Sequence, residues 1–269
     1  MNKKINLVLS FVVTLLLVGC GNTKDATSNK GLDKNLYTSN ILALNWEQQS
    51  GEFNALGYQA YNIATDNLVQ RIKEPTTKPL AVVLDIDETV LDNSPSVGED
   101  TLSNRAYSKE NFTKWANRAE CKLISGADKF LNKAKAFDVE VFYVTNRYKE
   151  DVDATIQNMQ KLNLPYADYE HIIYKDQESS KGARWDAISN KYEIVMFCGD
   201  NLNDFNIVFE KKNNEERKQL VKEMKDEFGK KYIILPNAIY GDWEGALYGY
   251  DYSKTEKQKF KDRYDLINK

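Results

Sequence analysis

Residues 80–94, LAVVLDIDETVLDNS, set the architecture that we expect for this chain. The apolar run 80–84 is typical of a strand that is buried on both faces, as in the centre of a parallel sheet. It ends in Asp85 and Asp87, at the end of the strand where open α/β sheets bind their ligands. Because residues i and i+2 of a strand point the same way, both carboxylates are expected to converge. Such a pair favours a cation between its members, and its oxygen ligands suit Mg²⁺.

A second apolar strand also ends in acid. Residues 193–199, EIVMFCG, precede Asp200, and in a parallel sheet this strand end is expected beside the first. Asp200 would then complete an oxygen-lined cation site with Asp85. Asp204 lies four residues further, on the same face of a helix expected to start there, and is expected to act as an indirect or water-mediated ligand.

Two other strand ends carry residues that suit an anion. Thr145 and Asn146 follow a strand expected over 139–144, although a threonine there is also typical of an ordinary helix start. Lys181 follows a short strand at 171–174 and begins a helix. A lysine is unfavourable at the positive end of the helix dipole, and a nearby anion would relieve this. A solvated surface lysine is the alternative interpretation of Lys181.

Helical patterns separate the strands. We expect one helix over 37–73, and others over 151–162, 203–228 and 254–269, with a last strand over 232–236. Strands that alternate with helices predict an α/β fold, with a parallel sheet flanked by helices.

The order of these motifs resembles that of the haloacid dehalogenase (HAD) phosphohydrolases. Within that superfamily, DIDETVLDNSP (85–95) and GDNLNDF (199–205) resemble the paired signatures of the bacterial class C acid phosphatases, also called the lipoprotein 5'-nucleotidase family. PNAIYGDW (236–243) resembles the late motif of that family. Ser96 is a departure, because the family usually has an aromatic residue after Ser-Pro, so one base-stacking contact is not expected here.

The resemblance implies a HAD-like (Rossmannoid) fold with a small helical cap, formed by roughly residues 93–137 and the N-terminal helix. It also implies an Mg²⁺-dependent acid phosphatase that hydrolyses small phosphomonoesters, in particular nucleoside 5'-monophosphates. Asp85 would attack phosphorus and form an aspartyl-phosphate, and Asp87 would act as general acid and base. Mg²⁺ would be held by Asp85, the backbone carbonyl of Asp87 and Asp200.

The remaining site residues follow from the same resemblance. Thr145, Asn146 and Lys181 would hold the phosphoryl oxygens. Tyr240 and Trp243 lie in the aromatic turn after the last strand, where they would stack on a nucleobase. Trp115 is expected near the site mouth, with an ordinary core tryptophan as the alternative.

The N-terminus resembles that of a bacterial lipoprotein. A basic start, MNKK, precedes an apolar run over 5–18 and the sequence LVGC, which ends at Cys20. We expect a signal peptide over 1–19, lipidation of Cys20, a flexible tether over 20–36 and the phosphatase domain over 37–269. The chain would then be lipid-anchored to a bacterial membrane on its extracytoplasmic face. A plain signal peptide or a short anchor helix is the alternative.

Composition excludes several classes of function. A formal net charge of -3 over 269 residues does not indicate a nucleic-acid polymer as partner. Three cysteines without metal-like spacing disfavour a disulfide scaffold or a zinc site. The one histidine, His171, starts a strand and is expected to be structural. A ligand-binding lipoprotein without turnover, a phosphotransferase and a homo-oligomer all stay open.

Overall fold

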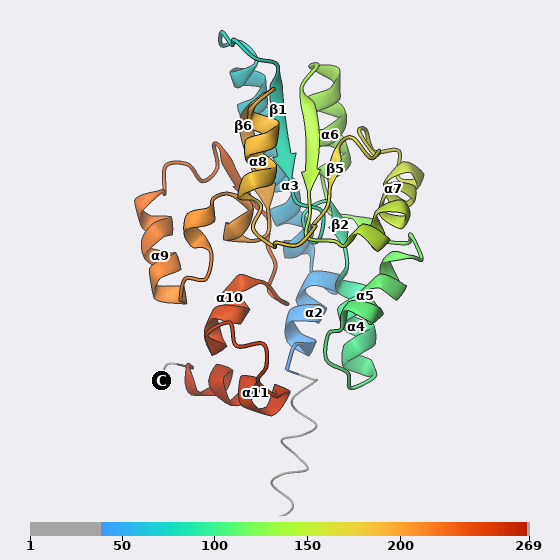
Figure 1. The fold of residues 1–269 in the computed structure, drawn as a ribbon, viewed down its shortest axis with the longest axis vertical. Helices are drawn as coiled ribbons and strands as arrows, with labels where there is room; N and C mark the ends of the chain where they lie inside the picture. The colour runs from blue at the N-terminus through green and yellow to red at the C-terminus, as the bar shows by residue number, and fades with distance from the viewer. Residues whose placement is uncertain (1–38, 268–269) are drawn as a thin grey trace, which may run out of the picture.

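A five-stranded parallel sheet forms the centre of the computed structural model, which describes residues 39–267. Its strand order is β5-β4-β1-β6-β7 (Figure 1). The strands are β1 (Leu80–Leu84), β4 (Glu140–Val144), β5 (Ile172–Ile173), β6 (Glu193–Gly199) and β7 (Tyr232–Ile234). β1 lies in the middle and pairs in parallel with both β4 and β6, so the predicted α/β fold with a parallel sheet is confirmed.

Strand β1 packs against an apolar cluster on each face of the sheet. All five of its residues are buried. Val82 and Leu84 join one apolar cluster, whereas Ala81 and Val83 join the other, as the two-residue period of a strand requires.

Helices cover both faces of this sheet. α3 (Gly51–Arg71), α6 (Ala127–Ala136) and α7 (Val152–Lys161) pack into the first cluster, and α8 (Gly182–Ser189) packs into the second (Figure 1). The carboxyl ends of the strands are therefore left open for a site.

A small helical insertion lies at those strand ends. β2 (Leu91–Asp92) and β3 (Lys122–Leu123) form a two-stranded antiparallel ribbon, and the insertion between them holds α4 (Ser94–Leu102) and α5 (Lys109–Ala116). The N-terminal helix α2 (Ile41–Gln49) packs against α4 (Figure 1). Helix α6, which falls inside the range predicted for the cap, instead packs against α3 and the sheet. The inserted cap is thus shorter than the predicted 93–137.

Two predicted helices are interrupted. The helix expected over 37–73 breaks at Ser50, whose backbone is extended and whose Oγ accepts a hydrogen bond from the N–H of Phe53, so Ser50 caps α3. The helix expected over 203–228 is replaced by the short 3₁₀ turns η2 (Leu202–Asp204) and η3 (Ile207–Phe209), followed by α9 (Asn214–Glu223). Asparagine side chains cap these segments, and such local caps end helices that apolar spacing alone would extend.

The C-terminal part of the chain returns to the same end of the molecule as the cap (Figure 1). It consists of α10 (Asp242–Gly245), the turn η4 (Ala246–Tyr248) and α11 (Glu256–Asp265), while one further turn, η1 (Lys149–Asp151), precedes α7. Within residues 39–267, no helix has both the length and the apolarity needed to cross a bilayer. The predicted signal peptide, Cys20 and the tether lie outside the described residues.

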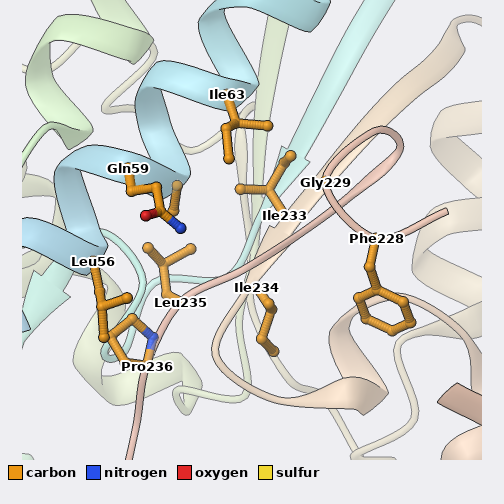
Figure 2. A pocket seen from close by; sticks show the side chains of 10 residues that line it. Leu56, Gln59, Ile63, Phe228, Gly229, Ile233, Ile234, Leu235 and Pro236 are labelled. Carbon is orange, nitrogen blue, oxygen red and sulfur yellow. The ribbon is translucent and has the colours of Figure 1, made fainter. Parts of the chain in front are cut away.

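An apolar groove of about 420 Å³ lies between α3 and the edge strand β7. Figure 2 shows Leu56, Ile63 and Pro236 among its lining side chains. None of the residues that line it is charged, so this groove offers no cationic side chain to a phosphate.

Candidate active site

Asp85 lies directly after β1 and is buried. Its backbone N–H donates to the carbonyl oxygen of Cys198, which continues the β1–β6 ladder and brings the two acidic strand ends together. Lys181, at the start of α8, reaches the same point, and its Nζ lies 2.5 Å from Asp85 Oδ1 and 2.6 Å from Asp204 Oδ1. Three predicted site residues, Asp85, Lys181 and Asp204, therefore meet.

A buried group of carboxylates surrounds this point. One oxygen from each of Asp85, Asp200 and Asp204 lies within 4.8 Å of the others. Burial raises the pKa of Asp85 to about 7, since the attraction of Lys181 does not offset burial and the repulsion of Asp204 and Asp87. Burial, Asp204 and Asp85 likewise raise the pKa of Asp200 well above its usual range. This surplus of negative charge fits a divalent cation bound by oxygen ligands.

Both oxygens of Asp204 and both oxygens of Asp200 accept hydrogen bonds. Asp204 accepts from Lys181 Nζ with Oδ1 and from the N–H of Asn201 with Oδ2, at 2.6 and 2.9 Å. Asp200 accepts from Thr89 Oγ1 at 3.2 Å and from Asn237 Nδ2 at 2.8 Å. Asp204 thus contacts Lys181 directly, and its indirect role at a cation stays a prediction.

Gly199 makes this arrangement possible. A Cβ on Gly199 would lie 2.3 Å from the Cβ of Asp204, so any side chain at this position displaces Asp204.

We expect Gly199→Ala to lower both stability and activity. Overpacking of this kind costs about 1–3 kcal/mol, and the displaced Asp204 would release Lys181 from its ion pair. Urea unfolding and phosphate release measure the two effects. A variant that retains wild-type values in both measurements would show that Asp204 does not need the space that Gly199 leaves.

Asp87 has partners that the sequence analysis missed. Arg147 donates to Asp87 Oδ1 from Nε at 2.9 Å and from Nη2 at 2.8 Å, and Asn93 Nδ2 donates to the same oxygen at 2.8 Å. The side chain of Arg147 is 1% exposed and that of Asp87 is 20% exposed. The signal available in the sequence was an arginine three residues after the end of β4 and two residues after Thr145.

Thr145 and Asn146 have different surroundings. Thr145 is buried, and its Oγ1 lies 3.5 Å from Asp87 Oδ2. Asn146 is exposed, and its Oδ1 accepts a hydrogen bond from Arg184 at 2.8 Å. Arg184 also donates to the backbone carbonyl of Thr145 at 2.6 Å. Arg184 was not predicted, and it fixes the backbone of the segment that carries Thr145.

The three predicted aromatic residues are placed unequally. Trp115 is 6% exposed, and its Nε1 donates to Asn93 Oδ1 at 3.0 Å, so its surroundings match the core alternative. Tyr240 and Trp243 are half-buried, and Trp243 Nε1 donates to the carbonyl oxygen of Tyr240 at 3.0 Å. Asn237 ties their loop to the site, because it binds Asp200 with Nδ2 and the N–H of Tyr240 with Oδ1.

The cap helix α2 is tied to the same loop by Glu47. Glu47 is 5% exposed, and its Oε1 accepts from the N–H of Ala238 at 2.7 Å, whereas its Oε2 has no hydrogen-bond partner within the described residues. Burial raises the pKa of Glu47 to about 7, against the lowering effect of the Ala238 N–H.

We expect Glu47→Gln to be more stabilising at high pH than at low pH. Glu47 has a higher pKa in the folded chain, about 7, than the ordinary 4.5, so the folded chain binds more protons between these values and loses stability as pH rises through them. Glutamine keeps the acceptor and removes that loss. The free energy of unfolding of the variant relative to wild type, measured in urea, should rise by about 2 kcal/mol between about pH 5 and about pH 8. If the free energies of unfolding of the variant and wild type differ by the same amount at both pH values, the result would contradict an ionisation of buried Glu47.

His171 and the described cysteines are not candidates for the reacting groups. His171 Nδ1 lies 2.7 Å from Asp168 Oδ1 and Nε2 lies 3.1 Å from Glu140 Oε2, which agrees with the structural role that we expected. Cys121 and Cys198 are free and buried, and burial raises the pKa of both thiols.

Comparison with known proteins assigns this arrangement to a family. A family model described as HAD superfamily, subfamily IIIB (acid phosphatase) matches residues 19–243. The structure of the class C acid phosphatase from Bacillus anthracis is 39% identical, covers 87% of this chain and 99% of its own chain, and superposes with a TM-score of 0.85. The crystal structure of that phosphatase with tungstate bound is 38% identical, with the same coverage and a TM-score of 0.84.

A more distant relative is the stem 31 kDa glycoprotein of Glycine max. It is 22% identical over 169 residues, which are 60% of this chain and 63% of the relative. The chain thus spans less than two thirds of the length of that curated relative.

Proposed function

Because the chain belongs to subfamily IIIB of the HAD superfamily, the acid phosphatases, which are phosphoric monoester hydrolases, we propose that it hydrolyses phosphomonoesters through an aspartyl-phosphate. One observation carries this proposal. Asp85 and Asp87 follow the central strand, Lys181 is bound to Asp85, and Asp200 lies at the adjacent strand end. The residues proposed as nucleophile, acid, cationic group and metal ligand thus lie at or beside the carboxyl ends of neighbouring strands.

In the first half of the reaction, a carboxylate oxygen of Asp85 attacks phosphorus. A bond forms between Asp85 and phosphorus while the bond from phosphorus to the leaving oxygen breaks. Asp87 gives its proton to that oxygen, so the product leaves as a neutral alcohol. In this proposal the Lys181 ammonium and the Thr145 hydroxyl hold the phosphoryl oxygens, together with the exposed Asn146; the contacts of Lys181 with Asp85 and of Thr145 with Asp87 support these roles.

In the second half, Asp87 acts as a base. Its carboxylate takes a proton from a water molecule, and that water attacks phosphorus of the aspartyl-phosphate. The bond to Asp85 breaks, inorganic phosphate leaves, and Asp85 and the protonated Asp87 are regenerated. Splitting one displacement into two easier steps is the general advantage of covalent catalysis.

A divalent cation, which we propose is Mg²⁺, would be held by Asp85, the backbone carbonyl of Asp87 and Asp200, with Asp204 acting through Lys181. When bound, it would offset negative charge on the carboxylates and the phosphoryl group. The raised pKa values of Asp85 and Asp200 are the physical support for such a cation.

We propose nucleoside 5'-monophosphates as substrates. The half-buried Tyr240 and Trp243 lie on the loop that Asn237 ties to Asp200, so a base held by either ring would stay near the reacting phosphate. The loss of an aromatic residue at Ser96 leaves more of this contact to that loop.

The proposed place of the enzyme is the extracytoplasmic face of a bacterial membrane, anchored through lipid on Cys20. The support is the sequence pattern of residues 1–20, namely basic residues, an apolar run and LVGC. An enzyme outside the cell that removes phosphate from nucleotides would release nucleosides and phosphate.

Phosphate release from nucleoside 5'-monophosphates and from p-nitrophenyl phosphate, with Mg²⁺ and with EDTA, tests the proposal. We expect turnover that EDTA abolishes and that favours the nucleotides. Equal rates on the aryl ester would reject the base contact by Tyr240 and Trp243. Binding of nucleotide without turnover would favour a ligand-binding lipoprotein. Phosphoryl transfer to an added alcohol in place of water would favour a phosphotransferase.

A further inference from the structure

We infer that Arg147, Asn93 and Trp115 are positioning residues that hold Asp87 in the orientation needed for proton transfer, so that the cap helix α5 supports the acid. This inference rests on the proposed function, in which Asp87 protonates the leaving group. It assigns no contact with substrate to these three residues.

The two oxygens of Asp87 are not equivalent. Oδ1 accepts all three strong hydrogen bonds, two from Arg147 and one from Asn93, at 2.8–2.9 Å. Oδ2 has only the hydroxyl of Thr145, at 3.5 Å. Since a carboxyl group held through one oxygen presents the other, the geometry makes Oδ2 the atom that carries the transferred proton.

The orientation of the Asn93 amide is fixed by its other neighbours. Its Oδ1 faces three donors, namely Trp115 Nε1 at 3.0 Å, Arg147 Nη2 at 3.1 Å and Cys121 Sγ at 3.3 Å. Its Nδ2 faces two acceptors, Asp87 Oδ1 and the carbonyl oxygen of Leu91. A flipped amide would place donors against donors, so only one orientation satisfies this site.

Arg147 is held just as firmly from the core side. Its Nη1 donates to Thr155 Oγ1 at 2.9 Å, and Thr155 in turn donates to the carbonyl oxygen of Asp151 at 2.6 Å. The guanidinium carbon also lies 5.5 Å from the ring centre of Phe112 on α5. Asp87 is therefore fixed from two sides, by Arg147 after β4 and by Asn93, whose amide is set from the cap.

The consequence is a dependence on the leaving group. A misplaced acid slows the cleavage of esters whose leaving oxygen needs a proton. A nitrophenolate leaves readily without one, so cleavage of its ester is affected less. Loss of the fold or of substrate binding would instead lower kcat/KM by the same factor for every ester.

The test uses a series of substituted phenyl phosphates with leaving phenols of increasing pKa, and kcat/KM is measured for each. This parameter reports formation of the aspartyl-phosphate, the step in which the alcohol leaves. For Trp115→Phe we expect kcat/KM to fall about tenfold on phenyl phosphate and to stay within about twofold of wild type on p-nitrophenyl phosphate. For Arg147→Lys, which keeps the charge but loses the fork, we expect about 100-fold on phenyl phosphate.

The matched control is Trp185→Phe. Trp185 is 8% exposed, close to the 6% of Trp115, but its Nε1 has no hydrogen-bond partner within residues 39–267. This control should leave the dependence on the leaving group unchanged, and the melting temperature of each variant checks its fold.

A steeper dependence on leaving-group pKa in Trp115→Phe and Arg147→Lys supports the inference. An equal loss across the series, or no loss, in folded Trp115→Phe overturns it. Wild-type turnover with such a result leaves the proposed function intact, whereas a wild-type chain that is inactive on the whole series overturns the proposed function and the inference with it.

Discussion

Asp85→Asn should lower phosphate release by at least roughly 10⁴-fold, the scale on which loss of a nucleophile acts in covalent catalysis. An amide of the same shape cannot attack phosphorus to form the acyl phosphate, although it can still accept a hydrogen bond from Lys181 Nζ. The measurement is phosphate release from a nucleoside 5'-monophosphate in excess Mg²⁺. The exposed residue Asp226 gives a control, since Asp226→Asn makes the same chemical change away from the site and should retain full activity.

The stability of Asp85→Asn distinguishes a chemical effect from unfolding. Asp85 has a pKa of about 7 in the folded chain against an ordinary value of 3.8, so without metal its ionisation lowers stability as pH rises between these values. The asparagine variant should therefore be at least as stable as wild type in EDTA above about pH 7. Turnover near the wild-type rate in this folded variant would contradict the aspartyl-phosphate.

Removal of the divalent cation should have the second largest effect. We expect EDTA to lower turnover on the order of 10³-fold, because Asp85, Asp200 and Asp204 are left without the positive charge that offsets them. Added Mg²⁺ should raise the melting temperature of wild type by several degrees, since a ligand that binds only the folded chain stabilises it.

Asp200→Asn provides the matched test of that site. Asparagine can keep the hydrogen bond from Asn237 with its amide oxygen, while its NH₂ group replaces the oxygen that accepts from Thr89 and can donate to the Thr89 hydroxyl; the change removes one carboxylate from the cluster. The variant should lose most of the stabilisation by Mg²⁺, while Asp226→Asn should keep it. A shift of the melting temperature as large as in wild type would show that Mg²⁺ binds elsewhere.

The central sheet and its acidic strand ends could be predicted because their signals are local. Apolar runs in the sequence identify β1 and β6; all five residues of β1 are buried, as are the last four of β6. Parallel pairing of the two strands then brings Asp85 and Asp200 together, independently of how the helices pack. The order of the motifs singles out Lys181, and its Nζ lies 2.5 Å from Asp85 Oδ1 in the structure.

The groups around Asp87 could not be predicted in the same way. Arg147 is 60 positions from Asp87, and its arginine side chain carries no local pattern that distinguishes a buried ion pair from a solvated one. The sequence around Trp115 does not distinguish a core position from one at the site mouth, because its contact with Asn93 depends on the cap folding back over the strand ends. The break at Ser50 was missed because apolar spacing continues across it, although Ser50-Gly51 is a local helix-start signal.

The most direct test of the account is to trap the enzyme during turnover. The full chain is mixed with a nucleoside 5'-monophosphate and Mg²⁺, quenched in acid within the first turnovers, and digested for mass spectrometry. The account predicts one phosphoryl group on the peptide that contains Asp85, absent when substrate is omitted and absent in Asp85→Asn. Rapid phosphate release with the phosphoryl group on another residue, or with Asp85→Asn still active, would contradict it.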